Sequence, residues 1–107
     1  MPYTGTDFPN ATVGEVITYF IDFTTDLAAG ETITASTVTC EVASDSTVND
    51  PNAANVVTGP SAISGNIIGQ KFMSMVFGVK YLVEFTASTS QGNEAIWWSH
   101  FFTDEPT

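Results

Sequence analysis

The sequence contains no arginine, two lysines and a single cysteine, and each scarcity excludes a class of protein. Twelve carboxylates stand against Lys71 and Lys80, which gives a formal net charge of −10. Because so few cations cannot neutralise phosphate groups, nucleic acids and anionic membrane surfaces are excluded as partners. Cys40 has no second cysteine to pair with, so no intrachain disulfide is expected, and the chain should fold in a reducing cytoplasm.

Long apolar runs are missing as well. The longest apolar stretches are far too short to cross a membrane, and residues 1–7 lack the basic and apolar segments of a signal peptide. Charged residues make up only 13% of the 107 residues, so threonine, serine, asparagine and glycine must cover much of the surface. This length predicts one domain over residues 1–107, with residues 1–12 as an extended N-terminal arm.

No useful helical periodicity appears, and threonine, valine, isoleucine and phenylalanine dominate the periodic stretches, which predicts an all-β chain. Strands are expected over residues 16–23, 32–42, 55–58, 61–63, one or two within 66–76, 80–88 and 95–102. This number and spacing predict an immunoglobulin-like Greek-key β-sandwich of about seven strands. A barrel or a jelly-roll fragment is the alternative.

Two local patterns add detail to the sandwich. Ile33 and Ala35 are out of phase with Val38 and Cys40, so a bulge near residues 36–37 is expected to bring them to one face. Before the next-to-last strand, Gly78-x-x-Tyr81 is typical of a tyrosine corner, in which the hydroxyl reaches back to nearby backbone.

The next-to-last strand alternates regularly. Tyr81, Val83, Phe85 and Ala87 share one face, and the residues between them are mostly polar or charged. This alternation predicts that the four side chains point into the core.

The last strand, in contrast, is apolar on both faces. One face carries Ile96, Trp98, His100 and Phe102, and the other carries Ala95, Trp97, Ser99 and Phe101. A small sandwich buries only one of these rows, and two exposed large aromatics would forgo about 3–6 kcal/mol of burial. We expect Trp97 and Phe101 to bind a neighbouring chain; the alternative is that Trp98 and Phe102 fill the core while Trp97 and Phe101 lie under a loop.

A second ambiguous segment covers residues 72–77. Met73, Met75 and Phe77 form one row of the strand expected there, and methionine suits both core filling and adaptable contact. Core burial is favoured for the two methionines, and all three residues are kept as candidate partner-binding residues together with Trp97 and Phe101.

Catalysis and metal binding have little support. Ser99 and His100 are adjacent on a strand and point to opposite faces, so they do not form a nucleophile–base pair. Asp45 and Asp50 lie in a polar loop that could offer oxygen ligands to calcium, but the loop lacks the spacing of a calcium-binding loop. We predict no catalytic residues, no metal site and no cofactor, and therefore a protein that is not an enzyme.

One stretch carries a family resemblance. Tyr19-x-Ile21-Asp22-Phe23-x-x-x-Leu27-Ala28-x-Gly30-Glu31-Thr32-Ile33, with the later Gly78-x-x-Tyr81 and a Ser/Thr-Gly hairpin over residues 88–92, resembles small immunoglobulin-like virion proteins of tailed phages. The usual tryptophan after the aspartate is Phe23 here, and that of the second strand is Val38. The resemblance implies a tail or fibre adaptor that binds other virion proteins in multiple copies per particle. It also implies a place in the virion after folding in the cytoplasm of a bacterial host, and it assigns no catalytic residues.

Two other functions are weighed against the adaptor. A capsid decoration protein that cements the shell belongs to the same structural class. A carbohydrate-binding module would stack sugar rings on Trp97 and Trp98, but adjacent strand residues face opposite ways and cannot form one platform. A structural adaptor that binds its partners through an aromatic strand face is therefore the preferred prediction.

Overall fold

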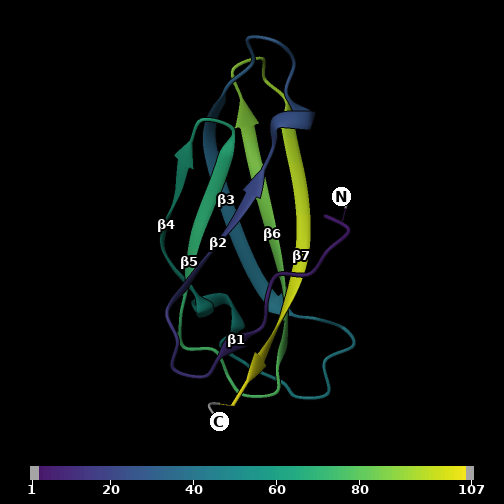
Figure 1. The fold of residues 1–107 in the computed structure, drawn as a ribbon, viewed down its shortest axis with the longest axis vertical. Helices are drawn as coiled ribbons and strands as arrows, with labels where there is room; N and C mark the ends of the chain where they lie inside the picture. The colour runs from purple at the N-terminus through teal and green to yellow at the C-terminus, as the bar shows by residue number, and fades with distance from the viewer. Residues whose placement is uncertain (1–2, 106–107) are drawn as a thin grey trace.

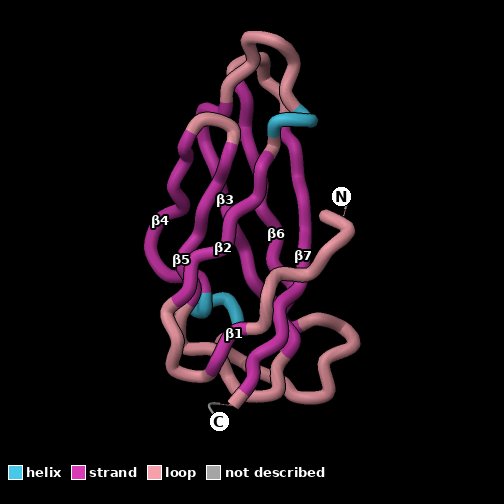
Figure 2. Tube along the Cα trace, in the orientation of Figure 1, coloured by secondary structure: helices cyan, strands magenta, loops and turns pink. Residues whose placement is uncertain are grey.

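The computed structural model describes residues 3–105 and consists of two β-sheets packed face to face (Figures 1 and 2). One sheet has four strands in the order β1-β7-β6-β3, and the other has three in the order β2-β5-β4. The strands are β1 (Ala11–Thr12), β2 (Ile17–Asp22), β3 (Ile33–Val42), β4 (Val57–Ser64), β5 (Ile67–Phe72), β6 (Lys80–Thr89) and β7 (Glu94–Asp104). Residues 1, 2, 106 and 107, which belong to the predicted domain and arm, lie outside the described residues.

Two short 3-10 helices, η1 (Thr24–Asp26) and η2 (Ala53–Val56), are the helical elements of residues 3–105. Neither is long and apolar enough to cross a membrane. The hairpins β4–β5 and β6–β7 stay within a sheet, whereas the other four connections, β1 to β2, β2 to β3, β3 to β4 and β5 to β6, cross between the sheets. The predicted all-β sandwich of about seven strands is confirmed.

The core forms where the predicted inward row of β6 faces the other sheet. Tyr81, Val83, Phe85 and Ala87 are all fully buried, as the alternation predicts. Phe72 of β5 and Tyr19 of β2 close the core from the opposite side, with ring centroids 5.7 Å apart.

The tyrosine corner is also confirmed. The Tyr81 hydroxyl accepts a hydrogen bond from the Val76 backbone N–H and donates one to Asp50 Oδ2, each at 2.8 Å. Asp50 lies in the loop expected to be polar, yet it is only 6% exposed, and its carboxylate accepts this bond from the buried Tyr81. The immunoglobulin-like form of the sandwich stays a prediction, which the tyrosine corner and the β2-β5-β4 order support.

Three local expectations about strands are corrected. The register shift in β3 lies between Ile33 and Ala35 rather than at residues 36–37, and Ala35 is exposed. The two short strands expected over residues 55–63 form the single strand β4, with an irregularity between Thr58 and Ala62. The strand expected over residues 66–76 ends at Phe72, and the chain then runs as a loop to β6.

The orientation expected for the last strand is wrong. β7 pairs with β6 so that Phe101 lies opposite Tyr81, and Trp97 lies opposite Phe85. Residues directly opposite on neighbouring strands share a face, so the Trp97–Phe101 row turns inward with β6. Phe101 is 1% exposed and fills the core, whereas Phe102 is exposed on the outer face.

The N-terminal segment covers the free side of β7. Ala11 pairs with Thr103 in parallel, and further up the Phe8 N–H donates to the His100 carbonyl at 2.9 Å. The Thr4 N–H donates to the Trp98 carbonyl at 3.0 Å. Figure 1 shows this segment in purple beside the yellow β7. We call residues 3–10 the arm; because of it, β7 is not an open sheet edge.

Candidate partner-binding surfaces

The five predicted partner-binding residues do not form one surface. Phe101 and Met75 are 1% and 4% exposed, so their side chains belong to the core and are not available to a partner in this chain. Phe77 and Met73 are 50% and 37% exposed. Trp97 is half-buried and packs against the edge of the core.

Half of the large apolar side chains that are exposed among residues 3–105 lie on loops at one end of the sandwich, and the others, Phe20 among them, lie elsewhere. The connections β1–β2, β3–η2 and β5–β6 all turn at this end, which is the lower end in Figure 1. They carry five exposed apolar residues, which we call the end surface: Val16, Val48, Met73, Val76 and Phe77. The Val48 side chain lies next to Gly78 of the β5–β6 loop. A Cβ atom added to Gly78 would be 3.1 Å from the Cγ2 atom of Val48.

Two hydrogen bonds and one buried side chain fix the β5–β6 loop, so the backbone at Phe77 is ordered. Val76 donates its N–H to Tyr81, Gly78 donates to the Thr103 carbonyl at 3.0 Å, and Met75 is buried below. Gly78 has φ of +81°, which suits glycine and turns the chain back into β6.

The neighbouring β3–η2 loop is tied to the start of β6. Lys80 Nζ forms an ion pair with Asp45 Oδ2 at 2.8 Å, and the Lys80 N–H donates to Ser46 Oγ at 3.1 Å. The hydrogen bond from Lys80 lowers the pKa of Asp45. Asp45 and Asp50, the loop residues considered as metal ligands, are therefore engaged with different partners.

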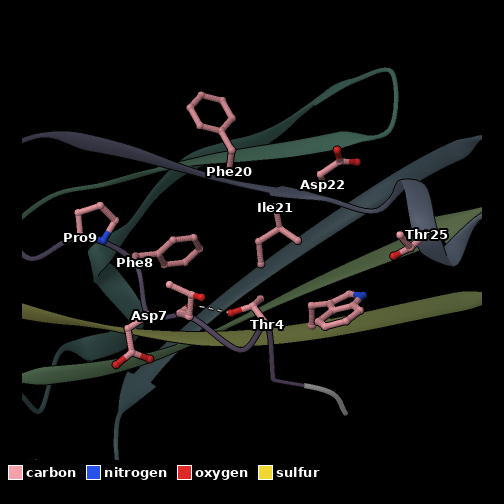
Figure 3. Close-up of a pocket in the computed structure, with 10 residues that line it drawn as sticks. Thr4, Asp7, Phe8, Pro9, Phe20, Ile21, Asp22 and Thr25 are labelled. Carbon is pink, nitrogen blue, oxygen red and sulfur yellow. Dashed lines mark hydrogen bonds between the residues drawn. The ribbon is translucent and has the colours of Figure 1, made fainter.

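A groove of about 360 Å³ lies between the arm and β2 (Figure 3). We call it the arm groove. The arm contributes Thr4, Thr6, Asp7, Phe8 and Pro9, and the rest of the lining comes from Phe20, Ile21, Asp22, Thr25 and Trp97. In Figure 3, Ile21 and Phe8 point toward one another, while Phe20 and Asp22 point away from them.

Trp97 is fixed in this groove by its indole nitrogen. Trp97 Nε1 donates to Asp26 Oδ2 at 2.6 Å, which joins β7 to the η1 turn after β2. The ring is therefore held by one polar bond and by the core edge. A partner in the groove would meet it already oriented.

The arm is itself fastened by aromatic and polar contacts. The Tyr3 ring lies 4.5 Å from that of Trp98, and the Phe8 ring stacks on Tyr19 at 4.4 Å with an interplanar angle of 7°. The Tyr3 hydroxyl donates to Asp7, and this bond, with a further contribution from His100, lowers the pKa of the Asp7 carboxyl.

The arm contacts were not foreseen, because the first ten residues show no periodicity that would assign them to a strand. In the structure, the register of β7 is set at the turn after β6. Thr89 N–H donates to the Asn93 carbonyl, and this tight hairpin fixes the register that turns Phe101 inward.

The arrangement of polar side chains shows no catalytic pair at the last strand. Ser99 is fully buried and donates to the Thr6 carbonyl, whereas His100 lies on the opposite face of β7. Within residues 3–105, no three histidine, cysteine, aspartate or glutamate side chains come together in a way that could hold a metal ion.

Comparison with known families decides the assignment. Residues 12–96 match the family model described as "Podophage GP4 fiber-tail adaptor protein gp77". The chain belongs to this family. The match runs from the end of β1 into β7 and includes Met73, Met75 and Phe77, while the arm and Trp97 lie outside it. Comparisons with curated proteins and with solved structures gave no match.

The resemblance to phage tail and fibre adaptors is therefore confirmed at the level of the family. The family is one of phage structural proteins. In this chain, the all-β sandwich carries the end surface and the arm groove.

Proposed function

We propose that this protein is a non-enzymatic structural adaptor of a phage virion that joins a fibre to the tail by binding other virion proteins. Family membership supports the tail-fibre context. The end surface supports the binding role, and its central observation is Phe77, half exposed on a loop whose backbone is held by Tyr81 and Thr103.

The physical argument rests on the free energy of burying exposed apolar groups. Burying a large apolar side chain contributes about 1.5–3 kcal/mol. A loop that is already ordered loses little conformational entropy when a partner covers it, so more of this free energy appears as affinity. Phe77, which shares the β5–β6 loop with the exposed Met73 and Val76, is therefore the preferred anchor.

An adaptor needs two separate contact surfaces, and this chain offers two. The end surface lies where β1–β2, β3–η2 and β5–β6 turn, and the arm groove lies along the side of the sandwich between the arm and β2. Trp97 keeps its proposed partner-binding role as part of the groove lining. We propose that the end surface and the groove contact different virion proteins.

The test uses phage particles produced without this chain. Purified wild-type protein is added back, and its bound copies per particle and its position are measured by quantitative mass spectrometry and particle imaging. We expect binding at the tail or its fibres, in a fixed number of copies.

The matched variants are Phe77→Ser at the end surface and Ile67→Ser on the outer face of the three-stranded sheet, which is 39% exposed. We expect Phe77→Ser to weaken binding by about tenfold, which corresponds to about 1.4 kcal/mol, and Ile67→Ser to bind like the wild type. Binding to the capsid shell, or no binding at all, would overturn the adaptor role.

A further inference from the structure

The outer edge of β2 is an open strand edge that faces the arm groove. Within residues 3–105, β2 pairs with β5 alone and forms the border of its sheet. The arm lies across the groove, and Thr4 and Phe8 donate their backbone N–H groups to carbonyls of β7. The two sides of the groove are therefore not joined by strand pairing.

The hydrogen-bond pattern shows which backbone groups of β2 are on its open edge. Phe23 donates its N–H to the Asn66 carbonyl, so these two residues form a hydrogen-bonded pair. The adjacent pair, Asp22 and Ile67, is then a non-hydrogen-bonded pair. Because bonded and non-bonded pairs alternate in an antiparallel ladder, Ile17, Tyr19 and Ile21 bond to β5.

The residues between them therefore direct their N–H and C=O groups away from β5. These residues are Thr18, Phe20 and Asp22. An extended segment laid along β2 would pair with these groups, and Trp97 and Ile21 are lining residues against which its side chains could pack.

Charge decides what kind of segment fits. Asp7 and Asp22 are among the residues that line the groove, with side chains that Figure 3 shows directed away from Ile21 and Phe8, and Asp26 accepts a hydrogen bond from Trp97. Bonds from Tyr3 and Thr24 lower the pKa of Asp7 and Asp22, so both carboxyls are ionised at neutral pH. Among the described residues that line the groove there is no lysine or arginine.

A second copy of this chain is a poor occupant. It carries a net charge of −10, and its cations are only Lys71 and Lys80. Two such chains repel one another, whereas an extended segment rich in lysine or arginine is attracted. The charge therefore favours a different protein.

We propose that the β2 edge accepts an extended, lysine- or arginine-bearing segment of another virion protein, which adds a strand to the three-stranded sheet inside the arm groove. This inference rests on the proposed adaptor function and names the chemistry of one of its partners.

The test uses the same particles made without this chain and the full-length protein. Thr18→Pro removes an N–H on the open edge of β2, which points away from β5, whereas it leaves the bonds between β2 and β5 in place, and proline is tolerated on edge strands. Thr18→Val keeps the N–H and serves as the matched control. We expect Thr18→Pro to weaken binding by about tenfold and Thr18→Val to bind within about twofold of the wild type.

The charge argument is tested with Asp7→Asn and Asp22→Asn together. Wild-type binding should weaken as NaCl rises from about 50 to about 500 mM, and the double variant should lose much of this dependence. The asparagine at position 22 keeps an oxygen that can accept from Thr24, so the η1 turn is preserved.

The outcomes separate the two proposals. One outcome overturns the strand-addition inference alone. In it the wild type binds, Phe77→Ser binds weakly, Thr18→Pro and Thr18→Val bind with equal affinity, and salt does not change the binding. If wild type does not bind, the adaptor function falls and the inference falls with it.

A second measurement covers the case in which Thr18→Pro does not fold. Hydrogen exchange of the wild-type amides at Thr18, Phe20 and Asp22 is compared between free and particle-bound protein. Slower exchange at these three amides in the bound form supports strand addition. Unchanged exchange overturns it.

Discussion

At the residue scale, a few polar groups decide how the loops of this sandwich are held. Tyr81 is the clearest example, because its hydroxyl satisfies both the Val76 N–H and the buried Asp50 carboxylate. The sequence motif Gly78-x-x-Tyr81 predicts the backbone contact, since the corner geometry is local. It does not predict Asp50, which lies 31 residues away in the chain.

Tyr81→Phe tests this arrangement. The substitution keeps the ring in the core but leaves Asp50 and the Val76 N–H without this partner. We expect the free energy of unfolding to fall by about 1–3 kcal/mol, measured by urea denaturation. An unchanged unfolding midpoint would show that the hydroxyl does not stabilise the loop.

Cys40 is the other residue whose environment defines its chemistry. It is 6% exposed, and burial raises the pKa of its thiol to about 12. A thiol with this pKa holds almost no thiolate at neutral pH, so it is a packing residue of β3 rather than a reactive one.

At the element scale, the arm is the segment whose conformation is hardest to predict from its sequence. It has no alternating pattern, yet it follows β7 and places Phe8 on Tyr19 and Tyr3 on Trp98. It also covers the backbone edge of β7 that would otherwise be open. Open edges are prone to pairing with other chains, so the arm limits such contacts.

Removal of residues 1–9 tests this role. The loss of the Phe8 and Tyr3 contacts should lower the free energy of unfolding by about 2–4 kcal/mol, and the exposed β7 edge should increase self-association. Thermal unfolding and size-exclusion chromatography measure the two effects. Phe8→Ala keeps the arm backbone, so it should lower stability without the increase in self-association.

A truncated protein that elutes like the full-length chain and unfolds at the same temperature would contradict the role given to the arm. If Phe8→Ala self-associates as strongly as the truncation, the side chain rather than the covered edge controls association.

At the scale of the whole molecule, the chain has a net charge of −10, and several of its carboxylates accept hydrogen bonds. Bonds from neighbouring groups lower the pKa of four carboxyls, which are Asp7, Asp22, Glu31 and Asp45. For Glu31 the largest cause is the bond from the Thr89 hydroxyl, followed by the Ala28 N–H.

These shifts predict how stability depends on pH. A carboxyl with a lower pKa in the folded state stabilises the protein above its unfolded value of about 4, and this contribution is lost as pH falls through the folded value. The melting temperature should therefore fall steeply below about pH 4. Glu31→Gln should lower it at pH 7 and flatten this acid limb, which thermal unfolding between pH 2 and pH 8 measures. Parallel curves for the two proteins would contradict the assignment.

Composition and local patterns are enough to specify the class of fold and much of the core. Alternation over residues 80–88 fixed the inward row of β6, because only one of its faces is apolar. The single cysteine, the tyrosine corner and the motif around Asp22 were also readable, because each depends on residues close together in the chain or on composition alone.

The burial of one row of β7 rather than the other depends on tertiary contacts. Both rows are apolar, so period-two alternation cannot choose between them, and the choice follows from pairing Phe101 with Tyr81. The same holds for the arm groove and the open edge of β2, which form between segments distant in sequence. Composition and alternation can be read from the chain itself. An exposed strand edge or a groove, in contrast, forms only when the strands have paired into sheets and the sheets have packed together.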